Sequence, residues 1–227
     1  MLEALFSGDI QGFLISLMLS LPIVFLALSL HETAHGLIAC KLGDPTAKSL
    51  GRLTLNPLKH LDPLGFICMI LFGFGWAKPV PINTRYFKKP KRDMALTALA
   101  GPVSNLLLAL IFALLLRLDM GLVAHLPLNT EFAYLCWFWS TQFLWLGVTL
   151  NVSLAVFNLI PIPPFDGSRI FLSMLPTKIY FKIMQYEQYL YILLMVLLVL
   201  GVLDGPLDFI TNKFLDLIFR ITFFDYT

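Results

Sequence analysis

The sequence has 227 residues, of which 58% are hydrophobic and 13% are charged, whereas soluble domains carry about 25% charged residues. This composition excludes an ordinary soluble domain and indicates a protein embedded in the lipid bilayer. The net charge of +2 is too small for a nucleic-acid-binding surface, so no nucleic acid is expected as a partner, and the three cysteines do not follow a disulfide-framework pattern.

Apolar segments predict a membrane-spanning helical bundle. A span needs about 20 mostly apolar residues, and the segments of that length are residues 11–40, 94–117, 133–160 and 181–203. We therefore expect an all-α, polytopic membrane protein with about four full spans. Residues 1–227 are expected to form one integral-membrane domain without an appended soluble domain.

Two shorter apolar segments need separate interpretations. Residues 65–77 are interrupted by glycines and the following stretch "GWAKPVPINTR" is rich in proline, so residues 65–85 predict a re-entrant or edge-strand segment. Residues 209–224 carry Asn212, Lys213, Asp216 and Arg220 among apolar residues, and predict an amphipathic or marginal C-terminal helix.

The basic residues predict the orientation of the spans, because cytoplasmic loops are enriched in Lys and Arg. Ten of the 16 Lys and Arg residues lie between the first and second predicted spans: Lys41, Lys48, Arg52, Lys59, Lys78, Arg85, Lys88, Lys89, Lys91 and Arg92. We therefore expect a multi-pass protein of the plasma or inner membrane, with its N-terminus outside and this loop in the cytoplasm.

The first predicted span carries the pattern HExxH at residues 31–35. Ionisable residues inside a span cost roughly 2.5–3.5 kcal/mol each on insertion scales, so they need a reason. His31 and His35 are four residues apart and project from one face of a helix, where both can bind one zinc ion while Glu32 acts as base toward a metal-bound water. The other interpretations are a polar cluster that joins helices, a proton relay or a metal-transport site.

Catalytic zinc needs a third protein ligand. The extension HExxHxxGxxH fails, because Ile38 and Lys41 stand at its glycine and last histidine. His125 falls in the predicted outer loop, and Asp44 and Asp62 lie in turn sequences where a capping role is the commoner explanation.

His60 and the other carboxylates remain as candidates, and among them we expect Asp166 to be the third ligand. It follows Pro161, Pro163 and Pro164, which break the third predicted span on the side of the membrane where the first span ends. An N-cap role, for a helix that starts near Arg169, explains the same residue equally well.

Together these motifs resemble the site-2 protease family of intramembrane zinc metalloproteases, peptidase family M50, in a compact bacterial form. The resemblance covers about residues 20–175 and depends on HETAH (31–35), GRLTLNP (51–57), GWAKPVPIN (75–83), AGPVSN (100–105) and NLIPIPPFDG (158–167). Phe165 stands where the family commonly has a leucine before Asp-Gly.

The resemblance implies a role for each motif residue. His31, His35 and Asp166 correspond to the ligands of one zinc ion per chain, and Glu32 to the catalytic glutamate. Asn158 corresponds to an asparagine that assists near the scissile carbonyl.

We therefore expect an intramembrane zinc endopeptidase that acts on membrane-spanning substrates near the cytoplasmic boundary of the bilayer, with its active site toward the cytoplasm. The alternatives are a metal-binding transporter or sensor with the same ligands, and a non-cleaving pseudoprotease that binds transmembrane helices. The sequence does not indicate a particular substrate or an oligomeric state.

Overall fold

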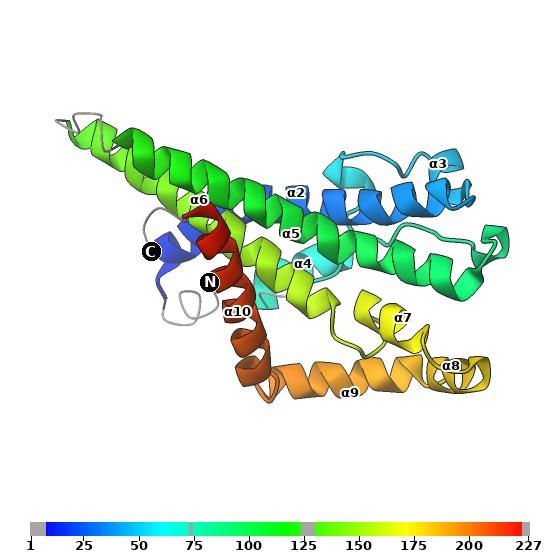
Figure 1. Ribbon diagram of the computed structural model, residues 1–227. Coiled ribbons are helices and arrows are strands. Elements are labelled where there is room, and N and C mark those ends of the chain that lie inside the picture. The colour runs from blue at the N-terminus through cyan, green and yellow to red at the C-terminus, as the bar shows by residue number, and fades with distance from the viewer. Residues whose placement is uncertain (1–7, 73–74, 124–129, 224–227) are drawn as a thin grey trace.

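The computed structural model describes residues 8–72, 75–123 and 130–223, and it is built from helices (Figure 1). In chain order they are α2 Ile10–Lys41, α3 Thr46–Ser49, the 3₁₀ turn η1 Pro57–Lys59, α4 Pro63–Phe72, the 3₁₀ turn η2 Thr84–Tyr86, α5 Pro90–Val123, α6 Glu131–Asn158, α7 Asp166–Leu172, α8 Thr177–Met184, α9 Glu187–Val199 and α10 Asp204–Thr222. The predicted all-α class is confirmed.

Three helices in the described part of the chain, α2, α5 and α6, are long and apolar enough to cross a membrane. They contain 32, 34 and 28 residues. At about 1.5 Å per residue each one exceeds the roughly 30 Å thickness of the hydrocarbon layer. The first three predicted spans therefore correspond to helices of sufficient length.

Helix α5 lies at the centre of the bundle and contacts α2, α6, α7 and α10. It runs antiparallel to both α2 and α6 (Figure 1). The core between these helices combines larger apolar side chains with alanines, and the small residues allow the helices to approach closely. Its members from the three long helices are Ile23, Ala27, Leu108, Ala109, Phe112, Ala113, Val148, Val152 and Val156.

The fourth predicted span differs from the structure. Instead of one helix over residues 181–203, the chain forms α8 and α9, which are separated at Gln185 and Tyr186. Gln185, Glu187 and Gln188 place polar side chains at this point, and the last two of them lie in the first turn of α9. With 13 residues, α9 is about 20 Å long, which is shorter than the hydrocarbon layer.

The predicted C-terminal amphipathic helix is α10, which begins earlier than expected, at Asp204. It crosses α5 and α6 at a steep angle (Figure 1). Its apolar side packs against the core through Phe214, Leu215, Ile218 and Phe219. The Phe219 ring stacks on Trp145 of α6 with 5.0 Å between the ring centroids.

The edge strand that was one of the two alternatives for residues 65–85 does not form in the described part of the chain. One isolated antiparallel bridge joins Leu61 to Ala77, and the residues after it are extended without a strand partner. Pro79 and Pro81 have no N–H to donate. Three other backbone donors bind groups elsewhere: Lys78 N binds His60 O, Val80 N binds Glu32 Oε2 and Asn83 N binds Asp44 Oδ2, each at 2.7 Å.

Candidate metal centre

His31, His35 and Asp166 come together inside the helix bundle. Nε2 of His31 lies 3.1 Å from Asp166 Oδ2, and Nε2 of His35 lies 3.2 Å from the same oxygen. Ligand atoms of the three residues all lie within 4.8 Å of one another. Both histidines are buried, and Asp166 is partly buried.

Local structure explains why residues so distant in the sequence meet here. The four-residue spacing of His31 and His35 puts both rings on one face of α2, with 4.5 Å between their centroids. Asp166 is the first residue of α7, which packs against α5. Gly167 allows the start of α7 to lie close to the end of α6, because a Cβ at this position would overlap the backbone of Leu159.

The N-cap interpretation of Asp166 is wrong. Phe165 occupies the N-cap position of α7, and the helix has no side-chain cap. Burial opposes ionisation of Asp166, but the adjacent imidazoles of His31 and then His35 outweigh that effect and lower the pKa of Asp166 to about 2. Asp166 is therefore a carboxylate, which is the form that binds metal ions.

A backbone carbonyl fixes the tautomer of His35. Its Nδ1 lies 2.7 Å from Thr97 O on α5, and a carbonyl can only accept, so Nδ1 carries the proton. In the neutral ring the lone pair is then on Nε2, directed at Asp166. Such a contact from the second ring nitrogen is characteristic of metal-binding histidines.

The donor set fits a zinc ion. The Nε2 lone pair of neutral His35 and the Asp166 oxygen are both acceptors, and acceptors 3.2 Å apart repel each other unless a cation or proton lies between them. Asp166 Oδ2 is buried and has no hydrogen-bond partner in the described part of the chain. Two imidazoles and one carboxylate are a known catalytic zinc set that leaves a fourth position for water.

Glu32 lies beside this cluster and is held by the extended segment described above. Its Oε2 accepts a 2.7 Å hydrogen bond from the backbone N–H of Val80. Because the prolines on either side of Val80 lack an N–H, Val80 is the one donor of this tripeptide. The contact fixes one carboxylate oxygen of Glu32 and leaves Oε1 for other partners.

Gly101 of α5 touches both imidazole rings. A Cβ added there would lie 2.5 Å from Cε1 and Nε2 of His31 and from Cε1 of His35. We expect Gly101→Ala to push the rings out of position, and displacements of about 1 Å at an active site can cost on the order of 100-fold in rate.

Zinc content and kcat of purified Gly101→Ala protein test this expectation. Gly121→Ala is the matched control, because it lies on the same helix with open space around its Cβ position. Equal zinc content and kcat in both variants would show that the rings tolerate a methyl group at Gly101.

The other candidate residues lie in different surroundings. Asp44 accepts hydrogen bonds from Thr46 and from the Asn83 backbone, and Asp62 accepts from Gly65 N (2.8 Å), so both have the predicted turn and capping roles. Asn158 ends α6, and its Nδ2 donates to Leu154 O one turn earlier (2.9 Å). His125 lies outside the described residues.

Sequence reasoning missed two contributors to this centre, the Thr97 carbonyl and the Val80 N–H. Both act through backbone atoms, which no side-chain pattern reveals. Gly101 entered the sequence analysis only as part of the AGPVSN motif, although a glycine facing HExxH across a close helix pair was a usable signal.

Comparison with known proteins gives consistent matches. The model of peptidase family M50 matches residues 13–202. Two relatives carry the name "Putative zinc metalloprotease": YwhC of Bacillus subtilis is 44% identical over 178 residues, covering 78% of this chain and 78% of that protein, and Rip2 of Mycolicibacterium smegmatis is 34% identical over 148 residues, covering 63% of this chain and 51% of that protein. No solved structure matches the chain.

Proposed function

Because this chain belongs to peptidase family M50 and is a zinc metalloprotease, we propose that it cleaves membrane-spanning substrates within the bilayer, near the cytoplasmic boundary. The proposal includes the residue roles: His31, His35 and Asp166 bind zinc, and Glu32 is the catalytic base. One observation is its main support. His31 and His35 lie beside Glu32 on α2, a helix long enough to span the membrane, and the Asp166 side chain of α7 meets them there.

When bound, zinc supplies Lewis acidity toward the peptide carbonyl and lowers the pKa of a coordinated water. Glu32 takes the proton from the attacking water and returns it to the leaving amine, as a general acid–base catalyst. The Val80 N–H holds Oε2 of Glu32, so the proton transfer falls to Oε1. Burial of His31 and His35 keeps bulk water away from the two rings and strengthens their electrostatic effect.

Asn158 is proposed to contact the substrate near the scissile carbonyl. One of its two amide hydrogens is used by Leu154 O, so the other remains to be donated. A donor aimed at the oxygen that becomes negatively charged stabilises the transition state. Its position at the last turn of α6, shortly before the chain reaches Asp166, is compatible with this role.

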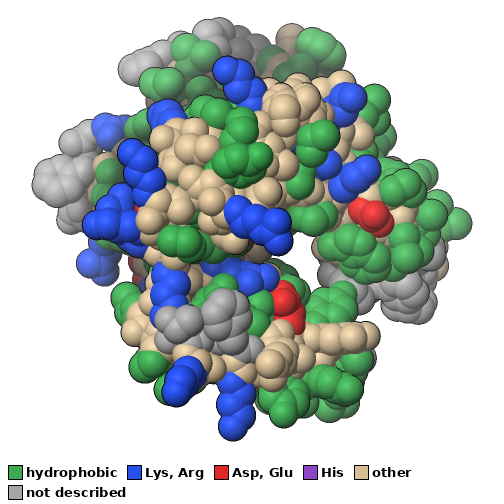
Figure 2. Space-filling model, turned by 90° about the vertical axis from the view of Figure 1, so that its right-hand side faces the viewer, with side chains coloured by type: hydrophobic (Ala, Val, Ile, Leu, Met, Phe, Trp, Pro, Cys, Tyr) green, Lys and Arg blue, Asp and Glu red, His purple; other side chains and the backbone are tan. Residues whose placement is uncertain are grey.

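The basic residues support a cytoplasmic position for the site. Figure 2 shows Lys and Arg side chains gathered over the end of the molecule where α2 ends and α5 begins. HExxH lies in the half of α2 nearest to this end. If this end faces the cytoplasm, as the distribution of Lys and Arg suggests, the cut falls in the cytoplasmic half of a substrate span.

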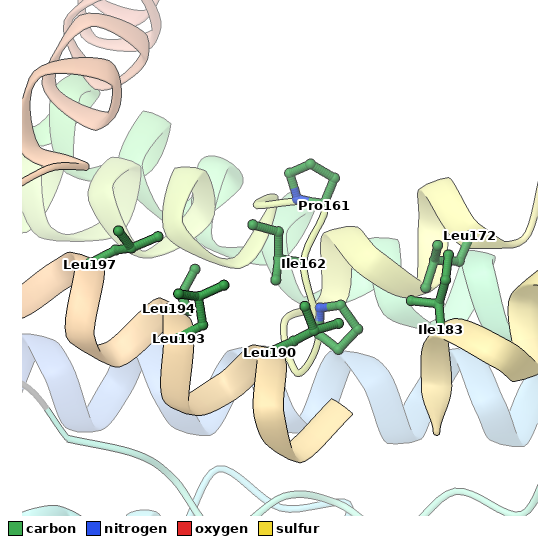
Figure 3. A pocket seen from close by; sticks show the side chains of 9 residues that line it. Pro161, Ile162, Leu172, Ile183, Leu190, Leu193, Leu194 and Leu197 are labelled. Carbon is green, nitrogen blue, oxygen red and sulfur yellow. The ribbon is translucent and has the colours of Figure 1, made fainter. Parts of the chain in front are cut away.

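An apolar cavity of about 160 Å³ lies next to the segment that leads to Asp166. It is bounded by Pro161, Ile162 and Pro163 on one side and by leucines of α9 on the other (Figure 3). The proposal assigns this cavity to apolar side chains of the substrate, since a transmembrane helix presents mainly such side chains.

A model substrate with one transmembrane helix and a different tag at each end tests the cleavage position. Incubation with the zinc-loaded enzyme in liposomes, followed by mass spectrometry of the products, should locate the cut within the cytoplasmic half of the helix. A soluble peptide with the sequence of an exposed loop of the model substrate serves as the control. Cleavage of that peptide alone, or of the substrate on its outer side, would contradict the proposed position.

A further inference from the structure

The second ring nitrogen of His31 has no partner, unlike that of His35. Nδ1 of His31 is buried and makes no hydrogen bond within the described part of the chain, whereas Nδ1 of His35 donates to Thr97 O. If His31 binds zinc through Nε2, its Nδ1 carries a proton that needs an acceptor. The inference below therefore rests on the proposed function, in which His31 binds zinc.

Asn105 on α5 is a buried amide that also lacks hydrogen-bond partners and can supply the acceptor that His31 needs. Its side chain is 0% exposed, and neither Nδ2 nor Oδ1 has a hydrogen-bond partner among the described residues. Buried amides nearly always have partners, so an unpaired one needs an explanation. The chemistry described so far makes no use of Asn105.

Helix register points these two unpaired groups toward the same interface. Helices α2 and α5 run antiparallel and pack together (Figure 1). His35 contacts Thr97, and one turn further along α5 Gly101 touches both rings. One more turn along α5 reaches Asn105, while the corresponding step back along α2 leads from His35 to His31.

We propose that Asn105 is a positioning residue for the zinc centre, with its Oδ1 accepting the Nδ1–H of His31 directly or through one water molecule. The contact fixes the tautomer and the ring orientation of His31, as Thr97 O does for His35. A small rotation of the amide, or one bridging water, satisfies both groups without a change in the backbone.

Zinc affinity measured by competition with a chelator tests this role without reference to catalysis. Asn105→Leu should weaken zinc binding by about 10- to 100-fold, which is typical for loss of such an outer contact. It should also alter the visible absorption spectrum of the cobalt-substituted protein, because the ring of His31 changes orientation. Asn105→Asp keeps the acceptor oxygen, so its affinity should remain within about threefold of the original protein.

Asn151→Leu is the matched control. Asn151 is also fully buried in a long helix, but its Nδ2 already donates to Gly147 O of its own helix. An equal loss of affinity in Asn151→Leu and Asn105→Leu, a normal affinity in Asn105→Leu, or an equal loss in the Asp and Leu variants would overturn the inference. Where the Leu variant does not purify as folded protein, Asn105→Ala takes its place.

The same measurement separates this inference from the proposed function. If the unmodified protein binds no zinc, the metalloprotease assignment of these residues fails. If it binds one zinc ion per chain and Asn105→Leu binds equally tightly, the assignment stands and only the role of Asn105 fails.

Discussion

Glu32→Gln should abolish proteolysis and leave the zinc ion in place. Glutamine has the same shape and can still accept the Val80 N–H, so the extended segment remains attached to α2. It cannot take a proton from water, and general acid–base catalysis contributes typically 10²–10⁴-fold to an enzymatic rate. We therefore expect kcat on a transmembrane substrate to fall by about 10³-fold or more, with one zinc ion per chain by mass spectrometry.

Glu131→Gln is the control for this variant. Glu131 is exposed at the start of α6, and its substitution should leave kcat unchanged. If Glu32→Gln keeps its zinc and loses cleavage, Glu32 acts as a base and not as a zinc ligand. The same result shows that the normal protein is a protease and not a transporter that only carries the metal. A Glu32→Gln protein that still cuts within tenfold of the normal rate would show that another group removes the proton.

Asp166→Ala should lose both zinc and activity. The substitution leaves His31 and His35 as the two remaining ligands, and catalytic zinc sites in proteins use three. The negative charge beside the imidazole pair also disappears, which weakens the attraction for a divalent cation. After dialysis against a mild chelator, the zinc content should fall well below one ion per chain, and cleavage should fall with it.

Asp208→Asn controls for the loss of one carboxylate elsewhere. Asp208 is exposed on α10, and its substitution should affect neither zinc content nor rate. If Asp166→Ala kept its full zinc content under the same dialysis, the ligand assignment would have to move to another residue.

The sequence was sufficient to predict that His31 and His35 share one face of α2. The spacing of His31 and His35 is a local property of a helix, and the long apolar segments around it have no other stable arrangement in a bilayer. For the same reason the first three spans agree with α2, α5 and α6 to within a few residues at most ends. The largest difference is at the end of α5, which continues to Val123.

Asp166 could be proposed from the sequence but not distinguished there from a helix cap. Its proximity to the histidines depends on how α6 ends, on the close approach of Gly167 to the Leu159 backbone and on the packing of α7 against α5. These are contacts between distant parts of the chain. Resemblance to a known family supplied what residue spacing could not.

Two errors have a common physical origin. The edge strand was predicted from the proline pattern of its own segment, and the fourth span from the apolar content of residues 181–203. Whether either structure forms depends also on the groups that each segment contacts. The backbone donors around Pro79 and Pro81 bind Glu32, Asp44 and His60 instead of a strand. The apolar residues of α8 and α9 are interrupted by a short polar stretch that a hydropathy average over 20 residues conceals.

We propose that two imidazoles from α2 and one carboxylate from α7 hold a single zinc ion. X-ray absorption spectroscopy at the zinc edge of the purified protein measures this ligand set directly. We expect two imidazole nitrogens at about 2.0–2.1 Å and carboxylate or water oxygens at about 2.0–2.2 Å, with loss of the bound zinc in Asp166→Ala. A spectrum with a sulfur ligand at about 2.3 Å, or with fewer than two imidazoles, would contradict it.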